Sequence, residues 1–498
     1  MRLFLLLIAP FFIIDVAFAQ QANDDLKENF ANALNRGLDG NPVSLEEIRT
    51  LIKQGADPNM YGYYHYQPEA TPLTMAVGRA WVPVAKVLLE NGADPNLPDK
   101  GQYPSVPLCH IGDVRNYPPA YGEEMAKLLI AHGAKIDTAD EHGNTPLVCM
   151  IRHHEIGAIK ALLNAGAEVQ QTALTMALDQ GYEDIAILLR EKEVKKTASS
   201  SSRLENDQKD DKYDSPICTA ARKGLLKALE TMPRQDKSAN ACALAQAVEK
   251  DQYEAAALLL KMGINPDEPY RNETPLLIAA REGKDKFVEL LLANKADLEI
   301  VVHYGSPGTS YTNGPSLTEA AAKGHVETVT LLLRHNAKAS TEALNRAIGG
   351  KHSDVAKVLL DSGVMPDPRA LVTAAESGQT EIIKWILDKG LNADSSVQYN
   401  VTPLMLAAKG GQVEMIDLLL DHKANIEAVN QPQMWYSSWE GIGDPFVGTP
   451  LMWAISSNQQ QATELLLKRG AKPTLEAVKL ATSGGNQRII AIIKSYQH

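Results

Sequence analysis

The strongest constraint on the fold is an interval of constant length that occurs five times along the chain. Each copy begins at the tripeptide Thr-Pro-Leu and ends at an alanine 20 residues after the leucine, as from Leu73 to Ala93 or from Leu451 to Ala471. Within each interval, two short segments carry apolar residues at helical spacing. A fixed interval of this kind predicts a repeated helix-turn-helix unit. The other three intervals begin at Leu147, Leu276 and Leu404.

Signals for the ends of the first helix occur at fixed places in these units. Proline fits the first helical turn, where its missing N–H costs nothing, and the threonine before it can cap the helix. Seven residues after the key leucine, a glycine can supply the positive φ that ends the helix. Glycines at this position are Gly181, Gly224, Gly283, Gly324, Gly378, Gly411 and Gly485.

The units resemble the ankyrin repeat, on the pattern Thr-Pro-Leu-x-x-Ala and on Gly324-His325-Val326-Glu327. This resemblance implies an all-α solenoid of helix-turn-helix units with β-turn fingers between them. The position after the key leucine holds residues such as Thr74 or Met405 where the family often has histidine. That departure puts hydrogen bonding between neighbouring repeats in question. Weaker units, which bring the number to about fourteen and almost fill the chain at ~33 residues each, have their key apolar residue at Phe30, Leu108, Leu174, Ile217, Leu244, Leu317, Leu344, Leu371 and Val478.

The spacing between units varies and predicts fingers of different length. Five units are followed by the next after only 27 residues, as from Leu317 to Leu344, and these should lack the finger tip. The spacing is 41 residues from Leu276 to Leu317 and 47 from Leu404 to Leu451, so these fingers should be long.

Two segments fall outside the repeat pattern. Residues 1–19 are typical of a secretory signal peptide, because Arg2 precedes an apolar run and Ala17-Phe18-Ala19 forms a cleavage site; a buried N-terminal helix is the alternative. Residues 194–215 are rich in Ser, Asp and Lys and predict a linker between a first array, 26–193, and a second array, 216–498. The sequence leaves open whether this linker is a hinge or is spanned by continuous stacking.

The four cysteines fall on predicted first helices of adjacent units, as Cys109 with Cys149 and Cys218 with Cys242. Neighbouring helix axes lie about 8–10 Å apart, whereas a disulfide needs Cα atoms within about 7 Å. We therefore predict buried free thiols, with disulfides in an exported protein as the alternative.

Charge and motifs exclude several functional classes. The formal net charge of −12 argues against a nucleic-acid surface, which needs Lys and Arg on phosphates. The N-terminal apolar run is too short to span a bilayer, and no longer one follows it. Histidines such as His325 and His352 fall at repeat positions, and His153-His154-Glu155 lacks the spacing of a zinc-protease helix. We expect no enzymatic activity, no metal and no cofactor.

Aromatic residues gather in the predicted fingers, although only 6% of the chain is aromatic. Tyr and Trp are enriched at the centres of protein interfaces. We predict that these side chains contact a partner; the alternative is that they pack on neighbouring fingers. The predicted contact residues are Tyr61, Tyr63, Tyr64, Tyr66, Tyr103, Tyr304, Tyr311, Trp435, Tyr436, Trp439 and Phe446.

The resemblance implies protein–protein recognition through fingers and first-helix surfaces, without catalysis. We therefore expect an exported, periplasmic or secreted, monomeric protein that binds a protein partner through its concave face. The alternative is a bacterial periplasmic inhibitor or immunity protein that neutralises a toxic enzyme such as a phospholipase, since an acidic groove would suit a basic toxin.

Overall fold

The computed structural model describes residues 24–37, 43–64, 67–100, 104–113, 120–140, 142–199, 215–232, 237–306, 309–431 and 447–496. The chain divides into two compact units, unit 1 with residues 1–239 and unit 2 with residues 240–498. Each unit is described by itself below.

Unit 1 is a stack of short helical hairpins. Residues 24–37 are helical. The later elements are α2 (Leu45–Lys53), β1 (Gly62–Tyr64), β2 (Gln67–Ala70), α3 (Pro72–Gly78), α4 (Val82–Glu90), the 3₁₀ helix η1 (Pro107–His110), α5 (Tyr121–Ala131), α6 (Pro146–Arg152), α7 (Ile156–Ala165), α8 (Gln171–Asp179), α9 (Glu183–Ser199), α10 (Pro216–Lys223) and α11 (Leu226–Glu230).

Unit 2 repeats the same hairpin more regularly. Its elements are α12 (Lys237–Glu249), which begins just before the boundary, α13 (Tyr253–Lys261), α14 (Pro275–Arg281), α15 (Asp285–Ala293), β3 (Val302–Ser306), β4 (Thr309–Asn313), α16 (Ser316–Lys323), α17 (Val326–Arg334), α18 (Thr341–Gly349), α19 (Ser353–Asp361), α20 (Pro368–Glu376), α21 (Thr380–Asp388), α22 (Pro403–Gly410), α23 (Val413–Asp421), α24 (Pro450–Ser456), α25 (Gln460–Lys468), α26 (Leu475–Gly484) and α27 (Gln487–Ser495).

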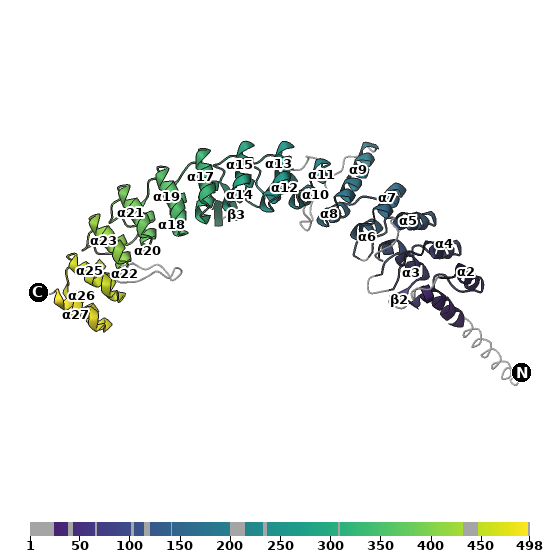
Figure 1. The fold of residues 1–498 in the computed structure, drawn as a ribbon, viewed down its shortest axis with the longest axis horizontal. Coiled ribbons are helices and arrows are strands. Elements are labelled where there is room, and N and C mark those ends of the chain that lie inside the picture. Colours follow the sequence, from purple (N-terminus) through teal and green to yellow (C-terminus); the bar gives the residue numbers. More distant parts are fainter. Residues whose placement is uncertain are drawn as a thin grey trace, which may run out of the picture. The chain divides into compact units, whose positions relative to one another are not determined.

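The helices of unit 2 form two layers. From α14 to α24, each even-numbered first helix packs on the next first helix, and each odd-numbered second helix packs on the next second helix. Figure 1 shows these two rows, with β3 beside the row of first helices. The prediction of an all-α repeat solenoid is confirmed.

The core is built from the predicted key residues. Leu276, Leu344 and Leu404 are fully buried, and so are their counterparts in the other repeats from Phe30 to Leu451. Val478 in the last repeat is only half-buried, because no further repeat covers it.

The turn between the two helices has a left-handed residue, as predicted. All seven predicted glycines have positive φ, from +67° at Gly283 and Gly411 to +82° at Gly324. The same position has positive φ where no glycine is present, at Ala80, His154, Asp251, Lys351 and Asn458. The backbone of the repeat therefore requires this conformation even where the side chain opposes it.

The long fingers contain hairpins, whereas the short connections do not. Strands β1 and β2 pair antiparallel before α3, and β3 and β4 pair antiparallel in the 41-residue unit. In the 27-residue units, a few residues join the second helix directly to the next first helix, as between α17 and α18. The predicted absence of finger tips there is confirmed.

One predicted helix is much shorter than expected. The unit that starts at Leu108 has a single 3₁₀ turn, η1, in place of its first helix. Gly112 has φ +105° only four residues after Leu108, so the helix ends before a second turn can form.

The stack continues on both sides of the predicted linker. Helix α10 packs on α8, and α11 packs on α9. The Glu183 carboxylate accepts hydrogen bonds from the backbone N–H groups of Lys227 and Ala228, at 2.8 and 3.1 Å. Arg222 also donates to Asp179 across the same junction. Residues 200–214 lie outside the described residues, and the helices before and after them are stacked on each other.

Hydrogen bonds between neighbouring repeats are present in unit 2, but they come from an unexpected position. The residue eight places after the key leucine, called position eight below, donates to a carbonyl at the end of the preceding first helix. Lys284 donates to the Val248 and Glu249 carbonyls, and His325 donates to that of Arg281. His352, Gln379 and Gln459 make the equivalent bonds to Ala322, Ile348 and Lys409.

The prediction of buried free thiols is right for one pair of cysteines and wrong for the other. Cys109 and Cys149 are free and buried. Cys218 and Cys242 are disulfide-bonded cysteines. The prediction equated the spacing of helix axes with the spacing of Cα atoms. Each Cα lies about 2.3 Å from its axis, so facing Cα atoms are several ångströms closer than the axes.

Among the helices that the structure describes, none has both the length and the apolar character needed to cross a membrane.

Candidate functional site

Tyr61 is the one predicted contact residue whose side chain the structure describes. Its hydroxyl donates to the Pro98 carbonyl at 3.1 Å, and the Lys100 ammonium lies 4.0 Å from the centre of its ring. Both partners belong to the next finger. Tyr61 therefore ties two neighbouring fingers together and is half-buried between them.

The structure describes the backbone of four more predicted residues. Tyr63 and Tyr64 lie in β1, and Tyr304 is the register partner of Tyr311 across the β3–β4 hairpin. The remaining six, Tyr66, Tyr103, Trp435, Tyr436, Trp439 and Phe446, lie outside the described residues.

An exposed group on the fingers of unit 2 contains residues that the aromatic criterion missed. Val397, Tyr399, Val429 and Val447, called the apolar finger patch below, are 51%, 41%, 50% and 40% exposed. Val397 and Tyr399 precede α22, whereas Val429 and Val447 precede α24 on either side of residues 432–446. The three valines lacked an aromatic signal, but an aliphatic residue between polar loop residues would have indicated them.

Hydrogen bonds hold the two parts of the patch together. The backbone N–H of Gln431 donates to the Tyr399 carbonyl at 2.6 Å and so links the two fingers. The buried Asn430 side chain accepts from the Gly448 N–H at 2.8 Å and from the Trp453 indole at 3.3 Å. Val429 and Val447 are the chain neighbours of Asn430 and Gly448, so this bond fixes both at the base of the longest finger.

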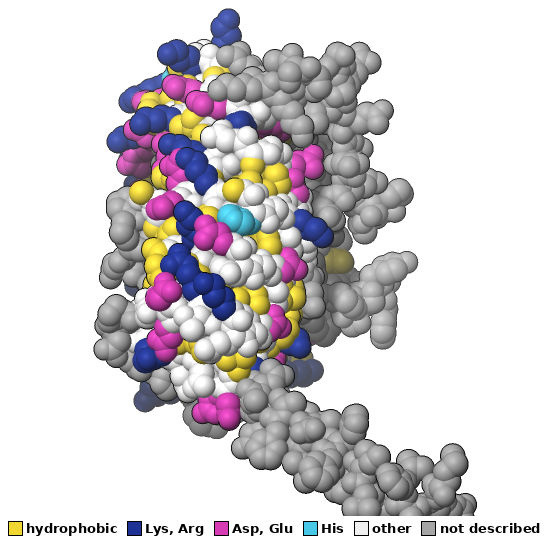
Figure 2. Space-filling model, turned by 90° about the vertical axis from the view of Figure 1, so that its right-hand side faces the viewer, with side chains coloured by type: hydrophobic (Ala, Val, Ile, Leu, Met, Phe, Trp, Pro, Cys, Tyr) yellow, Lys and Arg dark blue, Asp and Glu magenta, His cyan; other side chains and the backbone are white. Residues whose placement is uncertain are grey.

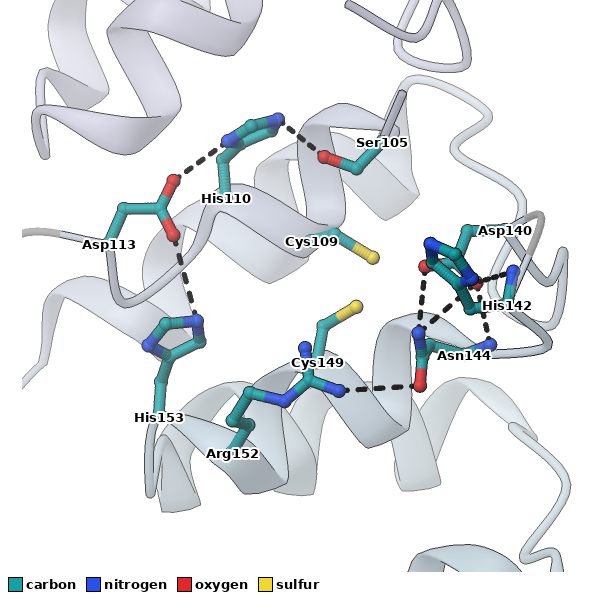
Figure 3. Close-up of a pocket in the computed structure, with 10 residues that line it drawn as sticks. All are labelled: Ser105, Cys109, His110, Asp113, Asp140, His142, Asn144, Cys149, Arg152 and His153. Atoms are coloured by element: carbon teal, nitrogen blue, oxygen red, sulfur yellow. Dashed lines mark hydrogen bonds and ion pairs between the residues drawn. The ribbon is translucent and has the colours of Figure 1, made fainter. Parts of the chain in front are cut away.

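Unit 1 contains a polar cavity of about 520 Å³ between η1, α6 and the loops beside them. Figure 3 shows side chains from both repeats turned toward it. Its lining residues are Ser105, Cys109, His110, Asp113, Asp140, His142, Asn144, Cys149, Arg152 and His153.

His110 is the buried charge at one side of this cavity. Its Nδ1 lies 2.7 Å from the Asp113 carboxylate, and its Nε2 lies 3.0 Å from Asp99 and 2.9 Å from Ser105 Oγ. Burial lowers the pKa of His110, but hydrogen bonds and attraction from Asp113 and Asp99 outweigh it and raise the pKa to about 9.

The order Ser105, His110, Asp113 looks like a hydrolase triad but cannot act as one near neutral pH. A general base must have a free lone pair to take the serine proton. His110 is an imidazolium at that pH, and a second carboxylate, from Asp99, is bound to the nitrogen that faces Ser105. The arrangement is a buried ion cluster that joins the loop before η1 to the turn after it.

The finger before α6 forms another side of the cavity and is held by Asp140. This carboxylate accepts from the backbone N–H groups of His142 and Asn144 and from the Asn144 side chain, at 2.8–2.9 Å. Burial raises the pKa of Asp140, but these hydrogen bonds lower it further, so the net shift is downward. The carboxylate stays ionised and keeps Asn144 in place to accept from Arg152 at 3.3 Å.

Among the described residues, no group of three or more His, Cys, Asp or Glu side chains has the geometry to hold a metal ion.

The repeat geometry agrees with the family comparison. The family described as "Ankyrin repeats (3 copies)" matches residues 120–200, 217–302 and 371–477, more than half of the chain. The single "Ankyrin repeat" matches residues 69–100. The chain belongs to the ankyrin-repeat family. The matched segments contain η1-to-α6 cavity residues as well as the regular hairpins of unit 2.

Similar proteins share the ankyrin repeats over limited parts of their length. "Ankyrin repeat and KH domain-containing protein mask-1" of Caenorhabditis elegans is 26% identical over 273 residues, which cover 51% of this chain and 9% of that protein. "Palmitoyltransferase ZDHHC13" of Mus musculus is 28% identical over 193 residues, 32% of this chain and 30% of that protein. The human ASB11 ankyrin repeat domain is a solved structure with a TM-score of 0.36 and 21% identity, covering 45% of this chain and 99% of that one.

Ankyrin repeats are protein-interaction modules, and this ankyrin-repeat chain therefore has the architecture of a protein that binds other proteins. The regular helices position the fingers, and the fingers present the side chains that differ from one repeat to the next.

Proposed function

We propose that this ankyrin-repeat protein binds a protein partner through the apolar finger patch and the adjoining first helices of unit 2, and that it does so without catalysis. The observation that carries the proposal is the exposure of Val397, Tyr399, Val429 and Val447 on neighbouring fingers. Each has two-fifths or more of its side chain in water, although hydrogen bonds of the fingers fix its backbone.

Exposed apolar side chains that are clustered and held rigidly are typical of interaction sites. Burying them against a partner gains the hydrophobic free energy of the removed surface, at ~25 cal/mol per Å². The Gln431–Tyr399 and Asn430–Gly448 bonds order the fingers before binding. Less conformational entropy is then lost when the partner binds.

Charge supports a protein partner over a nucleic acid. The chain carries a net charge of −12. On the face drawn in Figure 2, Lys and Arg side chains alternate with Asp and Glu instead of forming a basic surface. A basic or mixed protein surface suits such a face, whereas phosphate binding needs a continuous excess of cations.

We further propose that the protein is exported through the N-terminal segment 1–19 and acts outside the cytoplasm. The support is the arrangement of Arg2, the apolar run and Ala17-Phe18-Ala19 in the sequence.

The test is partner capture from the exported fraction of the native cell, with the purified full chain as bait. The patch variant carries Val397→Ser, Tyr399→Ser, Val429→Ser and Val447→Ser. A matched control carries Met365→Ser and Leu475→Ser, which replace apolar residues that are 64% and 65% exposed beside finger-less repeats. We expect the patch variant to lose at least tenfold in captured partner while its helical circular dichroism is unchanged. Equal capture by the patch variant and the wild type would contradict the proposal.

A further inference from the structure

Two free cysteines face each other inside the cavity of unit 1. Cys109 lies in η1 and Cys149 lies in α6, the first helices of adjacent repeats. Figure 3 shows their sulfur atoms pointing toward one another across the gap between these two elements. Both are free thiols and line the cavity, with 8% and 7% of each residue exposed.

The cavity gives small molecules a route to these sulfurs. Its volume of about 520 Å³ is in the range of sites that hold small ligands. The walls beside the thiols are polar, with Asn144 and the exposed Arg152 on the Cys149 side. The chain therefore does not seal the two thiols in an apolar core, where they would be inert.

The two thiols are not equivalent. Hydrogen bonding between them raises the pKa of Cys109, and burial and the carboxylates of Asp140 and Asp113 raise it further. The same hydrogen bond lowers the pKa of Cys149, and the positive charges of Arg152 and His110 act in the same direction against burial. Cys149 is thus the thiol that ionises first, and Cys109 is the one that stays protonated.

We propose that Cys109 and Cys149 form a redox-active dithiol site that reacts with low-molecular-weight disulfides. The Cys149 thiolate attacks one sulfur of the disulfide RSSR, forms a mixed disulfide and releases RS⁻. Cys109 then loses its proton and attacks the Cys149 sulfur, which forms the Cys109–Cys149 bond and releases the second RS⁻. One RSSR is reduced to two RSH while the two protein thiols are oxidised to one disulfide.

Closing this bond would link η1 covalently to α6. The single turn of η1 replaces a full helix in this repeat, so it is the segment of unit 1 with the shortest first helix among those described. A disulfide there would fix the least extensive junction between two repeats. Cys218 and Cys242 are already disulfide-bonded and do not take part.

The experiment uses the folded full chain with glutathione disulfide near neutral pH, followed by acid quenching, alkylation and peptide mass spectrometry. In the wild type we expect a Cys109–Cys149 linkage and no lasting glutathione adduct. Cys109→Ser should stop at a glutathione adduct on Cys149. In Cys149→Ser, the adduct on Cys109 should form at least about tenfold more slowly, because less of this thiol is ionised.

Arg152 offers a variant that does not touch the buried thiols. In the Cys109→Ser background, Arg152→Gln should slow adduct formation on Cys149 severalfold, and Arg152→Lys should restore most of the rate. Circular dichroism before reaction establishes that each variant is folded. Separate stable adducts on both cysteines of the wild type would overturn the proposal, as would equal rates for the two serine variants or no reaction in any of them.

Discussion

The two units follow the same repeat but depart from regularity to different degrees. In unit 2, hydrogen-bond donors at position eight, such as Lys284 and His325, link each first helix to the one before it. In unit 1 this position holds Trp81, Glu155, Tyr182 and Leu225. Tyr182 instead stacks on His154, with ring centres 4.3 Å apart.

What unit 1 has in place of this ladder is a local polar cluster. One first helix is reduced to η1, and the space it leaves is the cavity lined by His110, Cys109 and Cys149. The comparison indicates that regular repeats are held by a periodic contact, whereas an irregular repeat needs its own buried interactions. Those interactions bring reactive groups together, so chemistry is found where the repeat is interrupted.

The largest expected effect concerns the His110 cluster. Because its folded pKa of about 9 lies above the usual 6.5, the ion pairs stabilise unit 1 fully below pH 6.5, and this contribution is lost as the pH rises through 9. A shift of this size corresponds to up to about 3 kcal/mol. Urea unfolding of the wild type and His110→Gln should show a stability difference that shrinks from pH 6 to pH 10. A difference that does not change with pH would show that His110 is not charged in the folded state.

The next effect tests the ladder of unit 2. Lys284→Met removes donors to the Val248 and Glu249 carbonyls and ion pairs with Asp251 and Glu282, at 3.0 and 2.8 Å. We expect the local free energy of opening to fall by about 1–2 kcal/mol, measured by hydrogen exchange of the peptides that cover α12 and α14.

The matched control for this ladder variant is Lys286→Met. Lys286 is exposed on α15 two residues away. Its change should alter exchange by less than about 0.5 kcal/mol. Equal effects of the two lysine variants would mean that position eight does not couple the repeats.

The smallest effect concerns the left-handed turn that both units share. Lys351→Gly at φ +61° should stabilise unit 2 by about 0.5–1 kcal/mol, because glycine relieves the strained backbone but costs some entropy. Gly324→Ala should do the opposite, since a Cβ there would lie 2.4 Å from His352. Thermal unfolding should shift upward for the first variant and downward for the second; shifts of the same sign would contradict the turn argument.

Sequence predicts the repeats of both units well because the signals are local. The capping threonine, the helix-starting proline and the turn glycine act within one hairpin, and Leu276 or Leu404 is buried wherever such a hairpin stacks. The shared turn could even be extended to His154, which replaces glycine at the same position with φ +60°.

The features that sequence did not predict depend on residues from separate segments. Asp99 and Asp113 meet at His110 only after η1 has shortened the helix between them. Position eight varies among Lys, His and Gln, so it has no common letter, although all three can donate a hydrogen bond. The apolar finger patch joins residues from two fingers through Gln431 and Tyr399, and only the fold shows that these fingers are neighbours.

Hydrogen exchange of the full chain with and without its captured partner tests the central claim most directly. If the partner binds as proposed, the amides of residues 395–401 and 426–431 and of α22 will exchange more slowly in the complex, while those of α19, α21 and α23 will exchange as before. Protection confined to the second-helix row, or to unit 1 alone, would contradict binding through the apolar finger patch.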